Sequence, residues 1–120
     1  MTAPLRLVIL ESPYAGGALG DIARNIAYAR ACLRDCLMRG EAPLASHLLY
    51  TQPGVLDDLK PDERALGIGA GHAWLRVADA TVVYTDLGIS AGMRLGIVAA
   101  VQARRVIDYR QLGGFAWPSK

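Results

Sequence analysis

The sequence has few cysteines and no long apolar run, and both shortages restrict what the protein can be. Its two cysteines, Cys32 and Cys36, lie four residues apart in one predicted helix, a spacing that does not favour a disulfide. No Cys/His cluster surrounds them, so the sequence predicts reduced thiols, no metal site and a cytoplasmic location. The first apolar run, "LRLVIL", is too short for a signal peptide or a membrane span, and no membrane partner is expected.

An excess of charge of one sign is also missing. There are 13 Lys and Arg against 11 Asp and Glu, and the basic residues are scattered. A nucleic-acid-binding domain normally concentrates its basic residues on one face, so no nucleic-acid partner is expected. With 52% hydrophobic and 20% charged residues the chain has enough apolar material for a core, and its length predicts a single domain over residues 1–120.

Two common nucleotide-binding motifs are absent as well. The stretch "GIGAGHAW" contains glycines, but it lacks the lysine of a Walker loop and lies within a predicted helix. No GxGxxG dinucleotide fingerprint follows the first apolar run. The sequence therefore offers no motif for a cofactor, and none is expected.

What the sequence does contain is an alternation of strand and helix patterns. The run "LRLVILE" is rich in branched apolar residues, as are strands buried on both faces of a parallel sheet. Further strands are predicted at "APLASHLL", "ATVVYTD" and "RVIDYR", separated by helices over residues 22–39, 63–77 and 92–103. This alternation predicts an α/β fold with three layers, flavodoxin-like or Rossmann-like, and a parallel sheet of four to five strands in the order 2-1-3-4.

That strand order places a ligand cleft between the first and third strands. Ligands of such sheets bind outside the carboxyl ends of the strands, where the strand order reverses. The loops "ESPYAGG" and "TDLGISAG" should therefore face each other across one cleft. Glu11 and Asp86 end the two strands, and two neighbouring carboxylates can divide acid and base duties. The alternative is that each carboxylate caps a loop or the start of a helix.

The second loop also has the features of an anion site. Gly88, Ser90, Ala91 and Gly92 precede and open a predicted helix, whose free N–H groups and dipole favour a phosphate or carboxylate. Ser90 is compatible with both phosphate binding and an ordinary N-cap. Arg94 follows one turn later, where it either makes a bidentate contact to a phosphate or is a solvated surface residue.

The first loop supplies further candidate ligand contacts. They are Ser12, Pro13, Tyr14, Ala15 and Gly16. Tyr14 could stack on a base or anchor the loop. Asn25 lies near the start of the first helix, close enough to reach the cleft. His47 ends the second predicted strand, where it either enters the cleft from the side or has a structural role.

Other polar residues are interpreted as structural. His72 is expected to pack within its helix. Asp57 and Asp58 are interpreted as a solvated turn, and Glu63 and Arg64 as charges at the start of a helix.

Three segments together resemble a known family. "VILESPYAGG", "NIAYARA" and "ADATVVYTDLGISAGMRLGIVAA" resemble the nucleoside 2-deoxyribosyltransferases and the related deoxynucleoside monophosphate glycosidases. In that family the first strand ends in a Gly-Pro-aromatic loop, which Ser12, Pro13 and Tyr14 match in part. A later turn reads Gly-Met-Glu-Leu-Gly or similar, and here it reads Gly-Met-Arg-Leu-Gly from Gly92, through Met93, to residue 96. The order of elements matches over most of the chain, and these two segments are the specific part.

The resemblance implies a flavodoxin-like fold, a nucleotide-sized pocket and a homo-oligomer whose sites a neighbouring subunit completes. The family's glutamate in the turn attacks the anomeric carbon of deoxyribose, and its position here is taken by Arg94. An arginine stays protonated and cannot form a glycosyl ester. Asp79 matches an aspartate of the family that helps to protonate the base or to hold the sugar.

The sequence therefore leads to one main functional hypothesis and two alternatives. The main hypothesis is a protein that binds a nucleotide or nucleoside without glycosyl transfer, as a sensor or a sequestering protein. The first alternative is an N-glycosidase or deoxyribosyltransferase in which Glu11 or Asp86 serves as a relocated carboxylate. The second is an oligomeric interaction module with a vestigial cleft.

Overall fold

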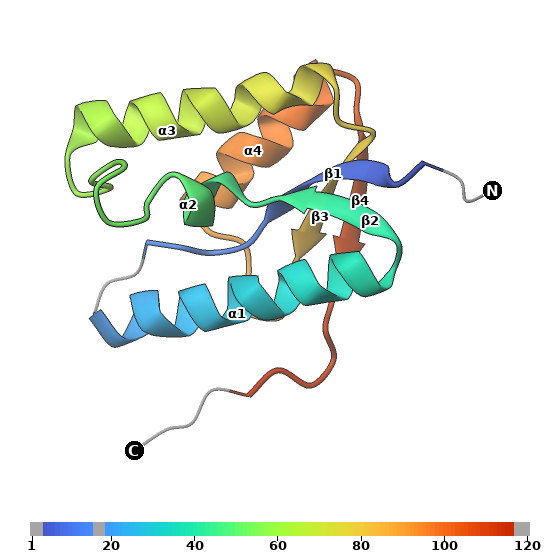
Figure 1. The fold of residues 1–120 in the computed structure, drawn as a ribbon, viewed down its shortest axis with the longest axis horizontal. Coiled ribbons are helices and arrows are strands. Elements are labelled where there is room, and N and C mark those ends of the chain that lie inside the picture. The colour runs from blue at the N-terminus through green and yellow to red at the C-terminus, as the bar shows by residue number, and fades with distance from the viewer. Residues whose placement is uncertain (1–3, 16–18, 117–120) are drawn as a thin grey trace.

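The computed structural model describes residues 4–15 and 19–116 and has one parallel sheet at its centre. The four strands of this part of the chain are β1 (Arg6–Glu11), β2 (Glu41–Leu44), β3 (Ala80–Tyr84) and β4 (Val106–Arg110). Their order is β2-β1-β3-β4, and every neighbouring pair is parallel (Figure 1). The predicted fold class and strand order are confirmed.

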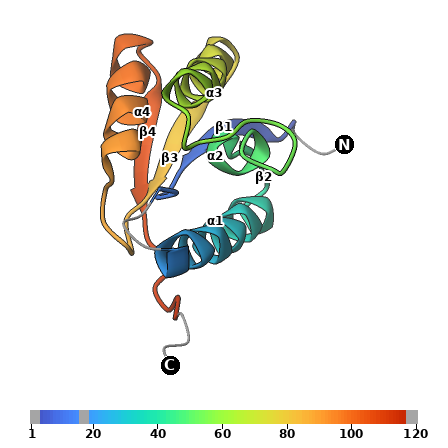
Figure 2. The ribbon, with the colours of Figure 1, turned by 90° about the vertical axis from the view of Figure 1, so that its left-hand side faces the viewer.

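Helices cover both faces of the sheet. Helix α1 (Leu19–Met38) lies on one face, and α3 (Pro61–Ala73) and α4 (Ala91–Gln102) lie on the other (Figure 2). Two short elements, α2 (Ser46–Leu49) and the 3-10 helix η1 (Trp74–Arg76), complete the described structure. Within the described ranges no helix combines the length and the apolarity needed to cross a membrane.

The side chains of the central strands point alternately to the two faces of the sheet, which explains why helices cover both faces. Val8 and Leu10 of β1 pack with Tyr28 and the two buried, free cysteines of α1. Ile9, between them, packs on the opposite face with Leu75 and with Ala100 of α4. Successive side chains of a strand point to opposite faces, so a strand with a continuous apolar run must be covered twice.

Ion pairs, one of them buried, connect the strands on the α1 face of the sheet. The Arg110 guanidinium donates to the Glu41 carboxylate at 2.6 Å, and both side chains are less than a tenth exposed. Arg6 donates to Asp108 at 3.0 Å and to Glu41 at 3.3 Å. The hydrogen bonds from Arg110 hold the pKa of Glu41 below its ordinary value. These pairs connect β1, β2 and β4.

The second strand and the second helix differ from the prediction in a way that affects the site. The second strand stops at Leu44, and residues 46–49 form one helical turn in which the N–H groups of Leu48 and Leu49 donate to the Ala45 carbonyl. The placement of His47 on a strand was therefore wrong. The helix predicted over 63–77 begins at Pro61, since proline fits a first helical position, and gives way to η1 at Trp74.

Candidate functional site

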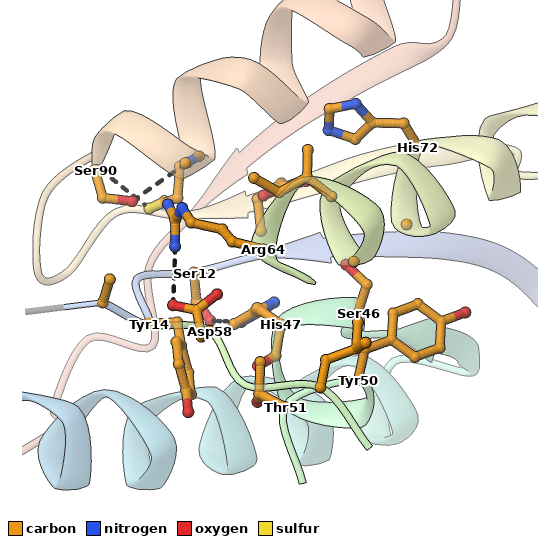
Figure 3. Close-up of a pocket in the computed structure, with 18 of the residues that line it drawn as sticks. Ser12, Tyr14, Ser46, His47, Tyr50, Thr51, Asp58, Arg64, His72 and Ser90 are labelled. Atoms are coloured by element: carbon orange, nitrogen blue, oxygen red, sulfur yellow. Dashed lines mark hydrogen bonds and ion pairs between the residues drawn. The ribbon is translucent and has the colours of Figure 1, made fainter. Parts of the chain in front are cut away.

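A cleft lies at the carboxyl end of β1, between α2, α3 and the start of α4 (Figure 3). Its lining includes Glu11, Ser12, Tyr14 and Ala15 after β1, Ser90, Ala91, Gly92 and Met93 at the start of α4, and residues of α2, α3 and the loop between them. The predicted meeting of the two loops is confirmed. The free volume is about 170 Å³, below the roughly 300 Å³ at which sites for drug-sized ligands begin. The enclosed part therefore holds one compact group, such as a sugar, and a larger ligand has to extend beyond it.

Glu11 is the unusual acid of this cleft. Burial raises the pKa of its carboxyl group to about 8. It makes no hydrogen bond or ion pair with any other residue in the described ranges. At pH 7 the group is therefore mostly a neutral acid that can donate a proton, and above pH 8 it is a carboxylate in a poorly solvated site.

The space for Glu11 is provided by a glycine of α4. A Cβ at position 96 would overlap the Glu11 carboxyl group, and Gly96 is itself buried. Any side chain at position 96 would therefore have to displace the acid. The Glu11 carboxyl group therefore lies against α4, the helix that also carries Arg94, two residues before Gly96.

Ser12 and His47 form a hydrogen-bonded pair in the same cleft. The distance from Ser12 Oγ to His47 Nε2 is 2.7 Å, and Ser12 is buried. Burial lowers the pKa of His47 to about 4, so its imidazole is neutral at pH 7. The ring accepts from or donates to the hydroxyl according to its tautomer. Although His47 lies on a helical turn and not on a strand, it lines the cleft, which is one of the two roles that the sequence left open.

At the start of α4, Ser90 is an N-cap. Its hydroxyl accepts from the Met93 N–H at 3.2 Å, and the first turn of the helix contains no acidic residue. The N–H groups of Ala91 and Gly92 lie in the first turn, where no intrahelical acceptor is available. Gly88 lies outside the lining of the cleft; its φ of 87° explains the glycine in this turn.

The cation of the cleft is Arg64 and not Arg94. Arg94 is exposed and does not line the cleft. Arg64 reaches into the cleft from α3 and donates through Nη1 to Asp58 Oδ2 at 2.9 Å (Figure 3). The sequence placed Asp58 in a solvated turn and Arg64 at the start of a helix; the structure adds that the two side chains form an ion pair in the lining of the cleft. No sequence motif marks this pair, because its place depends on how α3 packs beside α4.

Asp86, another candidate residue, lies outside the cleft lining and has its contacts elsewhere. Asp86 accepts from Tyr28 Oη at 2.6 Å and from the Leu112 N–H at 2.9 Å, which fixes the C-terminal segment against α1. Burial opposes the ionised form of Asp86, but these hydrogen bonds outweigh it and hold its pKa below the ordinary value. The expected facing pair of Glu11 and Asp86 is therefore not formed.

Asp79 and Asn25 also stabilise the backbone. Asp79 accepts from the Leu7 N–H at 2.7 Å. It lies at the amino end of β3, and the cleft lies at the carboxyl ends of the strands, on the other side of the molecule. Asn25 is buried and donates through Nδ2 to the Tyr14 carbonyl at 2.9 Å, so it shapes the first loop from behind. Pro13 is buried in that loop and outside the lining, and Gly16 lies outside the described residues.

The glycine-rich part of α3 has a packing role. A Cβ at Gly71 would overlap the Ser46 side chain, so the glycine allows α2 to approach α3. His72, expected to pack within its helix, lines the cleft beside this contact. Burial lowers the pKa of His72 below its ordinary value.

The described residues contain no group of three or more His, Cys, Asp or Glu side chains that could hold a metal ion. A family model described as "Domain of unknown function (DUF7768)" matches residues 6–110. Comparisons with curated proteins and with solved structures gave no match.

Proposed function

Because the chain belongs to the DUF7768 family, whose description names no activity, we propose from its cleft that the protein binds a nucleoside or nucleotide. The observation that carries the proposal is the convergence of Glu11, Ser12 and Tyr14 with the start of α4 in one cleft. This is the place where doubly wound sheets bind ligands. The resemblance to the deoxyribosyltransferases supports the same class of ligand.

The lining provides a partner for each part of such a ligand. Tyr14 offers an aromatic face to a base. Glu11 and the hydroxyl of Ser12, oriented by His47, suit the hydroxyl groups of a sugar. An anionic group fits at the first turn of α4, where N–H groups are free and acids are absent.

A second candidate function, cleavage of an N-glycosidic bond, is favoured by Glu11. In this reaction an ionised Glu11 oxygen bonds to the anomeric carbon as the C–N bond breaks. The base leaves with the bonding electrons and takes a proton from solvent. Water then hydrolyses the glycosyl ester and restores the carboxyl group. A reaction of this kind accelerates as the pH rises through about 8, because Glu11 reacts only as a carboxylate.

One incubation tests both functions. The protein is mixed with nucleosides, deoxynucleoside monophosphates and cyclic nucleotides, and the melting temperature and release of free base are followed. A thermal shift without base release supports binding alone. Base release that Glu11→Gln abolishes, and that Asp62→Asn retains, supports the enzyme. Asp62 is a suitable control because it is an exposed acid outside the cleft lining. If no compound shifts the melting temperature or releases free base, both proposals are contradicted and the oligomeric interaction module is the remaining hypothesis.

We further propose that the protein forms homo-oligomers in a reducing, cytoplasmic setting. Leu95, Val98 and Val101 of α4 follow one another at three-residue spacing and are each more than half exposed. Apolar side chains grouped in this way are typical of interaction surfaces. Light scattering tests the proposal, and a mass of 12.8 kDa, that of a single chain, would contradict it.

A further inference from the structure

We propose that Arg64 selects a ligand that carries a phosphate monoester, and that Asp58 occupies the place of this group until such a ligand binds. The inference rests on the proposed nucleoside or nucleotide binding and narrows it to nucleoside monophosphates. The Asp58 carboxylate would then act as an internal competitor that the phosphate displaces.

The composition of the cleft singles out Arg64. It is the only arginine or lysine among the described residues that line the cleft. Its side chain is 36% exposed, so its charge is partly shielded from water. An anion that enters the cleft has no other permanently charged cation to meet there.

The position of the guanidinium connects α3 with α4. Its Nη2 atom lies 3.6 Å from the position that a Cβ on Gly92 would occupy. That distance is an ordinary van der Waals contact, so the guanidinium lies directly beside the first turn of α4. A phosphate that binds next to both would contact the guanidinium on one side and the backbone of Ala91 and Gly92 on the other.

The existing ion pair uses only part of the guanidinium. Asp58 Oδ2 accepts from Nη1 at 2.9 Å, and Nη2 has no hydrogen-bond acceptor within the described ranges. A phosphate can accept from two guanidinium N–H groups at once, and at pH 7 it carries more charge than a carboxylate. Both differences favour phosphate over Asp58.

The loop around Asp58 allows a phosphate to displace the Asp58 carboxylate from Arg64. The neighbouring Asp57 is fixed by its own contacts, since its N–H donates to Glu63 Oε1 and its Oδ1 accepts from the Leu59 N–H, each at 3.0 Å. The Asp58 side chain takes part in neither contact. It can therefore turn away from Arg64 without unfolding the loop.

The test is a set of titrations by calorimetry with deoxynucleoside monophosphates, the matching deoxynucleosides and inorganic phosphate. The wild type should bind the monophosphates at least tenfold more tightly than the nucleosides. Arg64→Gln should remove this preference, whereas Arg94→Gln, which deletes the same charge outside the cleft, should keep it. Asp58→Asn should tighten monophosphate binding roughly two- to fivefold, the range of a partly exposed ion pair, and leave nucleoside binding unchanged.

The possible failures can be told apart. Equal affinity of the wild type for monophosphates and nucleosides overturns the role of Arg64 but leaves the proposed function intact. No binding of either class overturns both. Loss of the preference in Arg94→Gln but not in Arg64→Gln assigns the phosphate to Arg94 and overturns the inference. If Arg64→Gln does not fold, unchanged monophosphate affinity in Asp58→Asn overturns it instead.

Discussion

Two glutamates at opposite ends of the sheet differ in their partners. Glu41 accepts hydrogen bonds from the Arg110 guanidinium at 2.7 and 2.6 Å, which hold its pKa below the ordinary value. Glu11 has no ionic or hydrogen-bonded partner within the described ranges, and burial raises its pKa to about 8. Removing one member of a fully paired, buried ion pair strongly destabilises a fold. A largely buried acid without a partner is costly to ionise and is typical of functional sites.

The largest expected effect comes from breaking the paired glutamate. Glu41→Gln leaves the Arg110 charge buried without its carboxylate, and we expect a loss of about 3 kcal/mol in the free energy of unfolding. Urea denaturation at pH 7 measures this loss. Glu11→Gln, the same substitution in the cleft, should leave the protein at least as stable as the wild type. A similar loss in both variants would contradict the contrast between the two acids.

The pH dependence of stability should have opposite signs for the two acids. The pKa of Glu11 rises from 4.5 to about 8 on folding, so between these values unfolding releases its proton. Stability then falls with rising pH by up to about 1.4 kcal/mol per unit and levels off above pH 8. The lowered pKa of Glu41 has the opposite effect, because its contribution is lost as the pH falls below the ordinary range. Urea titrations of wild type and Glu11→Gln across pH 5–9 should converge toward acid and diverge toward base; parallel curves would refute the assignment.

A smaller effect tests the contact between Glu11 and α4. Gly69→Ala, at an exposed helical position with open space, should stabilise the protein by roughly 0.5–1 kcal/mol through helix propensity. Gly96→Ala should lack this gain, since its methyl group displaces the Glu11 carboxyl group. Adding Glu11→Ala should restore the gain, with a coupling energy of about 1 kcal/mol in a double-mutant cycle. Additive effects would show that the two residues do not meet.

The strand order and the place of the cleft were predictable because they depend on local patterns. The apolar runs of β1 and β3 mark the two central strands, and the loops that follow them must meet at one edge of a parallel sheet. Glu11 was identified on this basis. The environment of its carboxyl group was not predictable, because it depends on Gly96, a residue 85 positions away whose missing side chain makes room for the acid.

The errors concern the face that a helix presents and the kind of element to which a residue belongs. The start of α4 at Ala91 directs Arg94 to solvent, but the surrounding apolar residues do not reveal this, because Leu95 and Val98 are also exposed. Similarly, the apolar run around His47 fits a strand or a helical turn equally well. Arg64 was missed because only the packing of α3 beside α4 brings it to the cleft.

The most direct test of the account is the titration of the Glu11 side chain itself. Carbon-13 NMR of the glutamate carboxyl groups, assigned with Glu11→Gln, gives its pKa in the free protein and with a deoxynucleoside monophosphate. We expect a midpoint near 8 in the free protein, and a different midpoint once the ligand fills the cleft. A midpoint near the ordinary 4.5, unchanged by the ligand, would show that Glu11 is a solvated acid and that the cleft around it is not the binding site.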